Sequence, residues 1–400
     1  MQTSPRPFRF DADRAAIADL HARLDRTRFP DEVNDDEQSY GLCGDTLREL
    51  LAHWRHRFDW PAAVERINAL PQFTLDLDGL DLHFIHARSP HADATPLLIT
   101  HGWPGSIVEF LELIPRITQP ERFGGSADDA FHVVAPSLQG YGGSPPAVAP
   151  GMAPQRIAER HVRLMAALGY ERYALQGGDW GSLITHLTAT LASEHVIGAH
   201  FNLMVPTPPP GEADAMSLVR PHEQAWLAAG KAYGDHGSGY YHLQRTRPQT
   251  LAYALTDSPA GWCAWVAEKF LAWSDCERDG VRDIRNAMTL DALLTNVSLY
   301  WFTGTIASSL RLYRESTRAM GGATAPAIGR LSVPVGVANY PAETLRSPKA
   351  WVERQCPLVH WFEAPRGGHF AALEQPQIFA EDLWRFKQAL LGASAAGPLS

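Results

Sequence analysis

The segment Gln176–Ser182, QGGDWGS, could present an aspartate in a strained turn where its carboxylate can react. The segment stands between an apolar run that predicts a buried strand and a stretch with helical spacing. Gly177 and Gly181 would leave room for a backbone geometry that larger side chains obstruct. The pattern is that of a nucleophile elbow, with Asp179 in the position that serine usually occupies. The simpler alternative is a strand–turn–helix whose aspartate caps the helix.

A carboxylate nucleophile favours a different reaction from a serine nucleophile. It attacks acyl groups poorly, but it can displace a leaving group from a saturated carbon. The product would be an alkyl ester of Asp179 itself, which water must then hydrolyse. Asp179 therefore indicates substrates with a leaving group on sp³ carbon, such as epoxides or alkyl halides, and disfavours ordinary ester hydrolysis.

A second loop could stabilise the negative charge that develops while such an ester is hydrolysed. The sequence His101–Gly105, HGWPG, follows an apolar run typical of a strand and precedes the elbow in the chain. In elbow enzymes one oxyanion N–H comes from such a loop, and another comes from the residue after the nucleophile. We therefore expect the backbone N–H groups of Trp103 and Trp180 to form an oxyanion hole. A plain turn is the alternative for a short Gly/Pro motif.

The general base and its acidic partner are expected late in the chain. In enzymes with a nucleophile elbow, the catalytic residues follow one another along the chain as nucleophile, acid and histidine. His369 is the last of 17 histidines and lies between the last predicted strand and the last predicted helix. Glu343, in a loop after another predicted strand, fits the acid best, although spacing alone leaves Asp291 or another residue of the lid open. His369 would activate water, and the acid would orient its imidazole ring.

The leaving group separates the two substrate classes. An epoxide oxygen becomes a basic alkoxide and needs an acid, whereas a halide needs only N–H donors or a positive site. A tyrosine, whose ordinary pKa is about 10, can donate that hydrogen bond or proton. Six tyrosines lie in residues 206–330, and their spacing does not select among them: Tyr233, Tyr240, Tyr241, Tyr253, Tyr300 and Tyr313.

Positioning these residues requires an α/β fold in which short apolar strands alternate with helices. Such alternation predicts a mostly parallel sheet covered by helices on both faces. The predicted strands are 96–100, 131–135, 172–176, 196–203, 333–338 and 358–363, and the predicted helices are 107–117, 155–168, 181–191 and 376–391. Between 206 and 330 the spacing is mostly helical with no clear strand, which indicates a helical cap inserted into the α/β unit.

The first 90 residues precede this alternation. Helical spacing occurs at 12–28, 45–58 and 61–69, and residues 73–88 alternate by twos around Asp78-Gly79, which predicts a β-hairpin. We therefore divide the chain into four parts. They are an N-terminal segment with helices and the hairpin (1–90), a first core part (91–205), a helical cap or lid (206–330) and a second core part (331–400).

Composition excludes several other classes of protein. Lys and Arg total 35 and Asp and Glu total 44, and the net charge of −9 argues against nucleic acid or an anionic membrane as the main partner. The four cysteines form no CxxC pair, and the N-terminus lacks the apolar stretch of a signal peptide. With no apolar run long enough to span a bilayer, we expect a soluble, cytoplasmic protein.

The sequence offers no motif for a metal or a cofactor. His53 and His56, like His83 and His86, have H-x-x-H spacing, but neither pair has an HExxH context or an evident third ligand. No GxGxxG motif opens a βαβ unit and no GxxxxGK[ST] motif occurs, so nucleotide binding is not indicated. We expect no cofactor and no metal.

Over nearly its whole length the chain resembles epoxide hydrolases of the α/β-hydrolase fold, on the branch that includes the microsomal and juvenile-hormone enzymes. The resemblance rests on six stretches: 7–32, 101–106 (HGWPGS), 177–182 (GGDWGS), 238–270, 293–309 and 366–376 (RGGHFAALEQP). It implies that the first of these wraps around the catalytic domain. It further implies a small lipophilic epoxide as substrate, a diol as product and a role in detoxification, without the membrane anchor of the microsomal enzymes.

The resemblance also implies individual roles. Asp179 would be the nucleophile, His369 the base and Glu343 the acid. Tyr240 and Tyr313 would be the acids for the epoxide oxygen, with the adjacent Tyr241 as the alternative to Tyr240. The bond between Trp103 and Pro104 is expected to be cis, as it can be in this family.

Two other functions stay open at this point. A haloalkane dehalogenase would share the Asp–His chemistry, but it would lack the paired cap tyrosines and the long N-terminal segment. A non-catalytic binding protein of the same fold would usually have lost a triad member, whereas here nucleophile, base, acid and oxyanion motif are all in place. The sequence does not predict a homo-oligomer.

Overall fold

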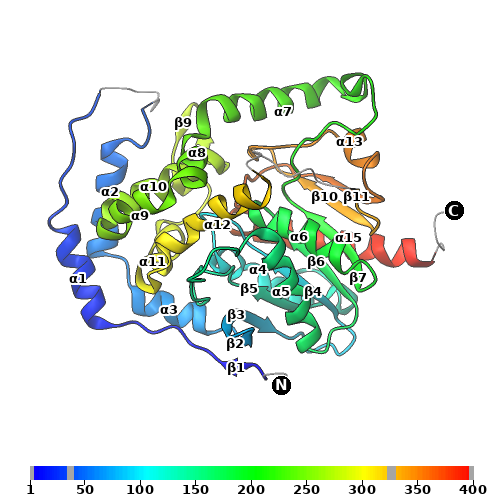
Figure 1. The fold of residues 1–400 in the computed structure, drawn as a ribbon, viewed down its shortest axis with the longest axis horizontal. Coiled ribbons are helices and arrows are strands. Elements are labelled where there is room, and N and C mark those ends of the chain that lie inside the picture. Colours follow the sequence, from blue (N-terminus) through cyan, green and yellow to red (C-terminus); the bar gives the residue numbers. More distant parts are fainter. Residues whose placement is uncertain (1–3, 34–39, 322–329, 396–400) are drawn as a thin grey trace.

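A computed structural model describes residues 4–33, 40–321 and 330–395, with side chains described up to residue 392. Its centre is a nine-stranded sheet in the order β1-β2-β3-β5-β4-β6-β7-β10-β11. The six strands from β5 to β11 in that order are parallel, and β1, β2 and β3 extend the sheet as antiparallel strands. Figure 1 shows helices on both faces of this sheet and a further group of helices beside it.

The strands are short and the helices vary in length. The strands of the large sheet are β1 (Arg6–Pro7), β2 (Gln72–Leu77), β3 (Leu80–Ala87), β4 (Thr95–Thr100), β5 (Phe131–Pro136), β6 (Tyr173–Gly177), β7 (Val196–Phe201), β10 (Val335–Asn339) and β11 (Leu358–Glu363). The helices outside residues 206–330 are α1 (Arg14–Leu24), α2 (Gly44–His56), α3 (Trp60–Asn68), α4 (Leu113–Thr118), α5 (Pro154–Ala167), α6 (Trp180–Leu191), α13 (Lys349–Glu353), α14 (Ala371–Glu374) and α15 (Pro376–Ala395). Three short 3-10 turns, η1 (Ile107–Phe110), η2 (Pro120–Phe123) and η3 (Ala127–Asp129), complete this part.

The predicted core strands and the hairpin are confirmed, with bounds shifted by one or two residues at most ends. The hairpin turns at Asp78 and Gly79, which both have positive φ, as a tight two-residue turn requires. The single helix predicted for 107–117 is wrong, because that stretch forms η1 and then the separate helix α4. Pro115 explains the break, since it has no N–H to donate to the turn before it.

Residues 206–330 hold six helices among the described residues, and they lie to one side of the sheet (Figure 1). They are α7 (Pro221–Ala232), α8 (Gly239–Thr246), α9 (Pro248–Asp257), α10 (Pro259–Trp273), α11 (Leu290–Thr303) and α12 (Ile306–Ala319), with short turns η4 (Ala215–Leu218), η5 (Tyr233–Gly237) and η6 (Ile284–Asn286). The helical pattern is confirmed. A small hairpin between β8 (Glu277–Arg278) and β9 (Val281–Arg282) was not predicted, because strands of two residues leave no periodic pattern.

The N-terminal helices pack against these inserted helices as well as against the core. The indole of Trp54 in α2 is buried and donates to Ser298 Oγ in α11 at 2.9 Å. Trp60, at the start of α3, stacks on Phe302 with ring centroids 4.9 Å apart. Leu20 and Leu24 of α1 belong to the same buried cluster as the apolar side chains of α10 and α11. The N-terminal segment therefore holds the inserted helices in place.

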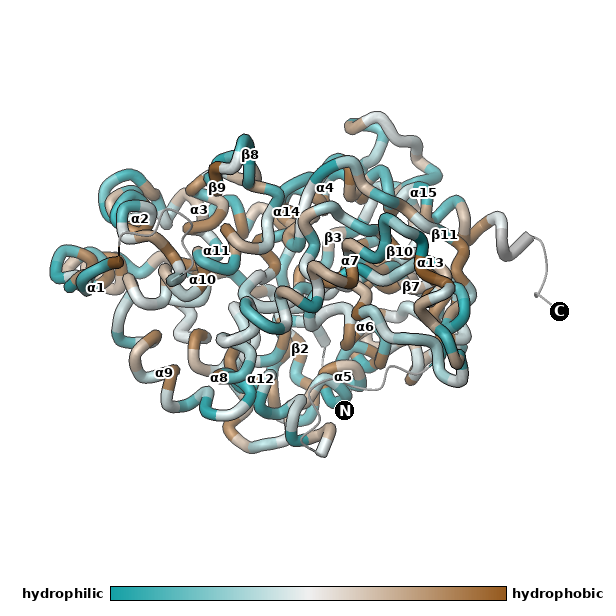
Figure 2. Tube along the Cα trace, turned by 90° about the horizontal axis from the view of Figure 1, so that it is seen from above, coloured by the Kyte–Doolittle hydropathy of each residue, from teal (hydrophilic) through white to brown (hydrophobic). Residues whose placement is uncertain are grey.

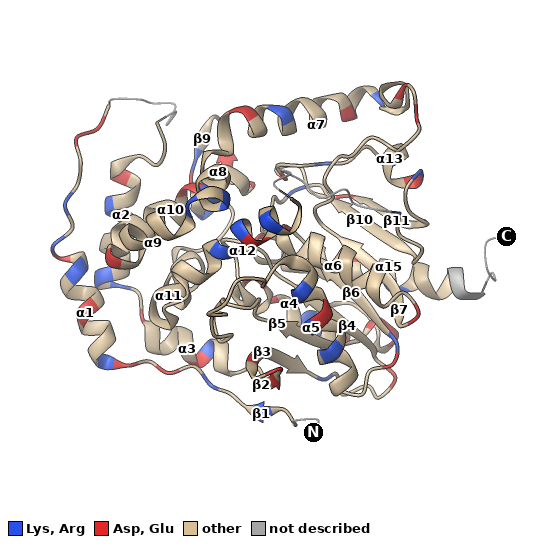
Figure 3. Ribbon diagram, viewed as in Figure 1, with Lys and Arg blue, Asp and Glu red and all other residues tan. Residues whose placement is uncertain are grey.

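Charge and hydropathy follow this arrangement. Figure 3 shows most Lys, Arg, Asp and Glu on outer helices and loops, with few on the central strands. Figure 2 shows hydrophilic and hydrophobic residues alternating along the outer helices, as expected for helices with one buried face. None of the helices in the described part of the chain is both long enough and apolar enough to cross a membrane.

Candidate active site

Asp179 occupies a sharp turn between β6 and α6. Its backbone has φ 51° and ψ −128°, a strained conformation for a residue other than glycine. The two flanking glycines make the turn possible, because a Cβ on Gly177 would overlap the Gly181 carbonyl and one on Gly181 would overlap the Thr100 carbonyl. The predicted elbow geometry is therefore present, and it lifts the Asp179 side chain above the ends of the strands.

The HGWPG loop lies directly against this carboxylate. The Trp103 backbone N–H donates to Asp179 Oδ1 at 2.8 Å. The Trp103–Pro104 bond is cis, as expected. Gly102 has no room for a side chain, because a Cβ there would overlap Asp179 Oδ1. The Trp180 N–H belongs to the residue that follows Asp179 and begins α6, and its part in an oxyanion hole stays a prediction.

Hydrogen bonds from both sides fix the HGWPG loop. His101 is buried, with Nδ1 bonded to the Gly102 carbonyl at 2.9 Å and Nε2 accepting from the Leu138 N–H at 3.1 Å. Burial lowers the pKa of His101 to about 4, so its ring is neutral and can make both bonds. From α11, Asn296 donates to the Pro104 carbonyl at 2.7 Å and Tyr300 donates to the Gly105 carbonyl.

His369 stands between Asp179 and Glu343. Its Nε2 is 3.5 Å from Asp179 Oδ2, and its Nδ1 is 2.9 Å from Glu343 Oε1. Glu343 is buried, and its Oε1 also accepts from the Thr344 N–H at 2.6 Å. The other candidate acid, Asp291, lies elsewhere and pairs with His53 at 2.6 Å. The structure thus brings together three of the residues proposed from the sequence. They are Asp179, His369 and Glu343, with His369 in the middle.

The electrostatics of this line favour an imidazolium in the free protein. Burial by itself lowers the pKa of His369, but the carboxylates of Glu343 and Asp179 outweigh it and raise that pKa well above its usual value. An alkyl group on Asp179 would remove one of these two negative charges. The His369 pKa would then fall, which suits a residue that must later accept a proton.

Two buried tyrosines from the inserted helices face the same place. Tyr240 in α8 stacks on Trp103, with ring centroids 5.3 Å apart and planes 11° apart. Tyr313 in α12 packs edge-on against Trp180 at 4.8 Å. Burial raises the pKa of both hydroxyls well above 10, so both stay protonated and can donate. The Tyr313 hydroxyl makes no well-aligned hydrogen bond within the described residues and has only the side chains of Tyr240 and Trp180 near it, so it can turn to a ligand.

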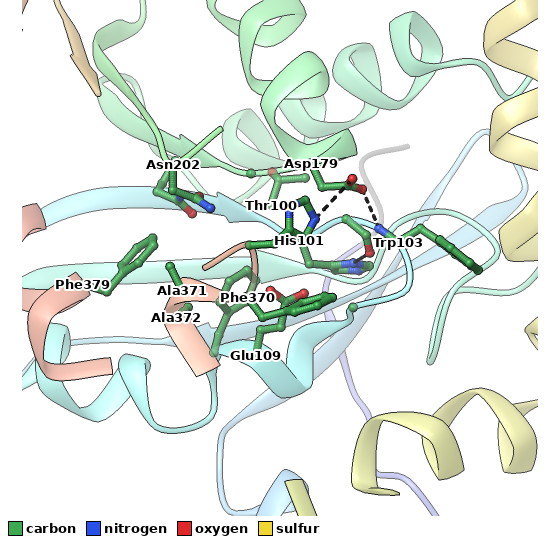
Figure 4. A pocket seen from close by; sticks show the side chains of 16 residues that line it. Thr100, His101, Trp103, Glu109, Asp179, Asn202, Phe370, Ala371, Ala372 and Phe379 are labelled. Carbon is green, nitrogen blue, oxygen red and sulfur yellow. Dashed lines mark hydrogen bonds and ion pairs between the residues drawn. The ribbon is translucent and has the colours of Figure 1, made fainter. Parts of the chain in front are cut away.

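Asp179 and His369 line two cavities of different size. The large cavity, about 260 Å³, lies between the core and the inserted helices, where Tyr240 and Tyr313 line it. Its wall is completed by mostly apolar side chains, among them Trp180, Leu183, Leu203, Val205, Tyr241 and Leu345. The small cavity, about 20 Å³, lies within the core. Figure 4 shows it with Asp179 and Trp103 on one side and Glu109 and Phe370 on the other.

Several neighbours of the site were missed by sequence reasoning. Trp273 packs against both His369, at 5.0 Å between ring centroids, and Tyr240, at 5.3 Å. The Tyr233 hydroxyl lies 3.0 Å from the Tyr240 hydroxyl. Tyr233 was one of six tyrosines that spacing could not rank, and nothing in the sequence marked Trp273.

The H-x-x-H pairs have ordinary contacts. His83 bonds Ser137 and Gln72, and His86 bonds the Tyr170 hydroxyl at 2.8 Å. In the described ranges, no three His, Cys, Asp or Glu side chains gather closely enough to hold a metal ion.

Comparisons with known proteins agree on one family. A family model described as the epoxide hydrolase N terminus matches residues 5–110, and one for the alpha/beta hydrolase fold matches residues 95–230. Epoxide hydrolase 1 of Oryctolagus cuniculus is 35% identical over 96% of this chain and 88% of that protein. A Stigmatella aurantiaca protein provisionally named an epoxide hydrolase is 44% identical over 94% of this chain and 83% of its own length. The crystal structure of juvenile hormone epoxide hydrolase from Bombyx mori superimposes with a TM-score of 0.88 and 32% identity, covering 98% of this chain and 96% of that one.

Proposed function

The chain belongs to the epoxide hydrolases of the α/β-hydrolase fold, and from that premise we propose that it opens epoxides through a covalent ester on Asp179. The fold and the family expected from the sequence are confirmed by the comparisons. The roles of individual residues are our proposal. It is carried above all by one observation, the line Asp179–His369–Glu343 beneath a cavity with two buried tyrosine hydroxyls.

In the first step, an Asp179 oxygen attacks a carbon of the epoxide ring and the bond from that carbon to the ring oxygen breaks. Tyr240 and Tyr313 hydrogen-bond the ring oxygen and protonate the alkoxide as it forms. Tyr240 is preferred over Tyr241 because it is buried against Trp103, whereas Tyr241 is partly exposed. The product is a hydroxyalkyl ester of Asp179.

In the second step, a water molecule attacks the carboxyl carbon of Asp179. His369 accepts a proton from that water while Glu343 orients its ring and stabilises the imidazolium. Negative charge develops on the Asp179 oxygen that the Trp103 N–H holds at 2.8 Å, with the Trp180 N–H as the proposed second donor. When the bond from the carboxyl carbon to the alkyl oxygen breaks, the alkoxide takes the proton from His369 and leaves as the diol. The proton that remains on the Asp179 carboxyl returns to the tyrosinate formed in the first step, which restores both Asp179 and the tyrosine.

The substrate is proposed to be a small, lipophilic epoxide without net charge. The large cavity supports this, since aromatic and aliphatic side chains make up most of its wall and its 260 Å³ suits a small molecule. Residues 206–330 are proposed to act as a cap, with 91–205 and 331–400 as the two parts of the core and 1–90 as the segment that holds the cap. Neither nucleic acid nor a metal has a part in this proposal.

The ester can be trapped by removing the base. In His369→Gln, alkylation of Asp179 should proceed and hydrolysis should slow by about 10²- to 10⁴-fold, as expected for the loss of a general base. Intact-mass measurement after addition of styrene oxide should therefore show the protein plus one substrate mass, and peptide mapping should locate the addition at Asp179.

A matched control is His222→Gln, in which an exposed histidine of α7 is changed. It should form diol at the wild-type rate and accumulate no ester. If His369→Gln binds the epoxide but gains no mass at Asp179, the covalent mechanism is wrong.

A further inference from the structure

The small cavity beside Asp179 has room for a single water molecule. Its volume is about 20 Å³, and roughly 10–15 Å³ is enough to hold one water. Asp179 and His369 both line it, so a water there would lie next to the ester carbon and next to the base. His369 accepts only one of the two O–H groups of that water. The other O–H needs an acceptor of its own.

Most polar side chains around the small cavity already have partners. His101 uses both ring nitrogens on the backbone, and Gln176 donates to Asn202 at 2.7 Å. Glu109, at the centre of η1, lines the cavity opposite Asp179 and has no part in the two steps described above (Figure 4). Its carboxyl lies against the HGWPG loop, since a Cβ on Gly105 would overlap Glu109 Oε1.

Glu109 also has a contact that stabilises the start of η1, apart from any role in the reaction. Ser106 Oγ accepts from the Val108 N–H at 3.2 Å and so caps the start of η1, and the Ser106 backbone N–H is near enough to the Glu109 carboxyl to lower its pKa. A carboxylate has two oxygens, and the Ser106 N–H requires only one of them. The second oxygen is left for the cavity.

We propose that Glu109 is a further catalytic residue, which accepts a hydrogen bond from the second O–H of the hydrolytic water while His369 accepts the proton of the first. The proposal rests on the two-step function proposed above. As the water oxygen attacks the carboxyl carbon of Asp179, the proton moves to His369 Nε2. The bond from that carbon to the alkyl oxygen then breaks, and the departing alkoxide receives the proton from His369. Glu109 holds and orients the water throughout, without net proton transfer.

The charges around Glu109 shift its pKa in both directions. Burial raises the pKa of Glu109 to about 8, the positive His369 lowers it, and the negative Asp179 and Glu374 raise it. Esterification removes the charge of Asp179 and with it that part of the increase. The fall in the His369 pKa then takes away the positive charge that lowers the Glu109 pKa, so the two changes act in opposite directions, and the position of Glu109 beside the small cavity is what supports the role.

Glu109→Gln separates the two roles of this side chain. A glutamine can still accept from the Ser106 N–H through its one oxygen, but it then presents an N–H donor to the water in place of an acceptor. With styrene oxide in single-turnover rapid-quench experiments, alkylation should keep its wild-type rate and ester hydrolysis should slow by about 10- to 100-fold. In the steady state kcat and KM should fall together, kcat/KM should be unchanged, and intact-mass spectra should show accumulated ester.

The control is Glu112→Gln, because Glu112 lies on the same segment and its half-exposed side chain contacts only Arg66 and Arg116 among described ion pairs. It should hydrolyse the ester at the wild-type rate. If Glu109→Gln does so as well while His369→Gln traps the ester, Glu109 has only a structural role and the proposal fails. If no variant, including His369→Gln, forms an ester, the proposed function itself fails, which is a separate result.

Discussion

The two cavities that meet at Asp179 differ in size, origin and chemistry. The large cavity, about 260 Å³, takes much of its wall from the inserted helices and is rich in aromatic rings. The small cavity, about 20 Å³, is built by core loops and includes the HGWPG backbone and Glu109. Asp179 and His369 line both cavities. The large cavity adds protonated tyrosines that can donate, whereas the small cavity adds the carboxyl group of Glu109.

This difference indicates how one carboxylate can meet two unlike reactants. A lipophilic epoxide needs an apolar chamber and an acid, while water needs a base and a small polar space. The two cavities offer these two environments at one carboxylate, since Asp179 lines both. We therefore expect substitutions at the large cavity to slow alkylation and substitutions at the small cavity or behind His369 to slow hydrolysis.

The largest effect is expected where the two cavities meet. Asp179→Ala removes the nucleophile of the first step and the ester of the second, so turnover should fall by about 10⁴-fold or more. Diol formation from styrene oxide checks this, with the exposed Asp45→Ala as control. Substantial diol formation by Asp179→Ala would show that water attacks the epoxide directly, and the division between the two cavities would lose its basis.

The elbow and the HGWPG loop were predictable because their geometry is set locally. Glycines at 177 and 181 are needed wherever a strand turns into a helix at such an angle, and the backbone contacts at both positions show why. The contact between His369 and Glu343 was harder to predict, since spacing left Asp291 open and only the resemblance to a family decided it. The structure separates the two, because Asp291 pairs with His53.

The side chains of the cap and of the small cavity depend on contacts between distant parts of the chain. Tyr240 meets Trp103 only because α8 folds over the core. Glu109 belongs to an S-x-x-E pattern that marks the start of a helix and carries no sign of a cavity. Helical spacing predicts which residues share a face of one helix, but it cannot predict what that face packs against.

A smaller effect, confined to ester hydrolysis, is expected when Glu343, the partner of His369, is changed. Glu343→Gln removes a carboxylate that raises the His369 pKa. The His369 pKa should therefore fall, and His369 should become neutral at a lower pH than in the wild type. Because hydrolysis requires neutral His369, its rise with pH should move to lower pH. Its maximum should drop by about 10³- to 10⁴-fold, since the imidazolium loses its partner.

Rapid-quench measurement of ester hydrolysis from pH 5 to 9 tests this pH dependence, with the exposed Glu353→Gln of α13 as control. Alkylation should stay within a few-fold of wild type, because the Asp179 carboxylate is intact. A pH profile that keeps its wild-type midpoint would mean that Glu343 does not act through His369.

The smallest of these effects should appear at the large cavity. Tyr240→Phe and Tyr313→Phe each remove one donor to the epoxide oxygen, so alkylation should slow by about 10- to 100-fold in each variant and further in the double variant. The exposed Tyr253→Phe of α9 is the matched control. Hydrolysis of an ester already formed should be unaffected, because both tyrosines line the large cavity and neither lines the small one. If the double variant alkylates at an unchanged rate, Tyr240 and Tyr313 are not the acids for the epoxide oxygen. If its ester hydrolysis slows, the two cavities do not act separately.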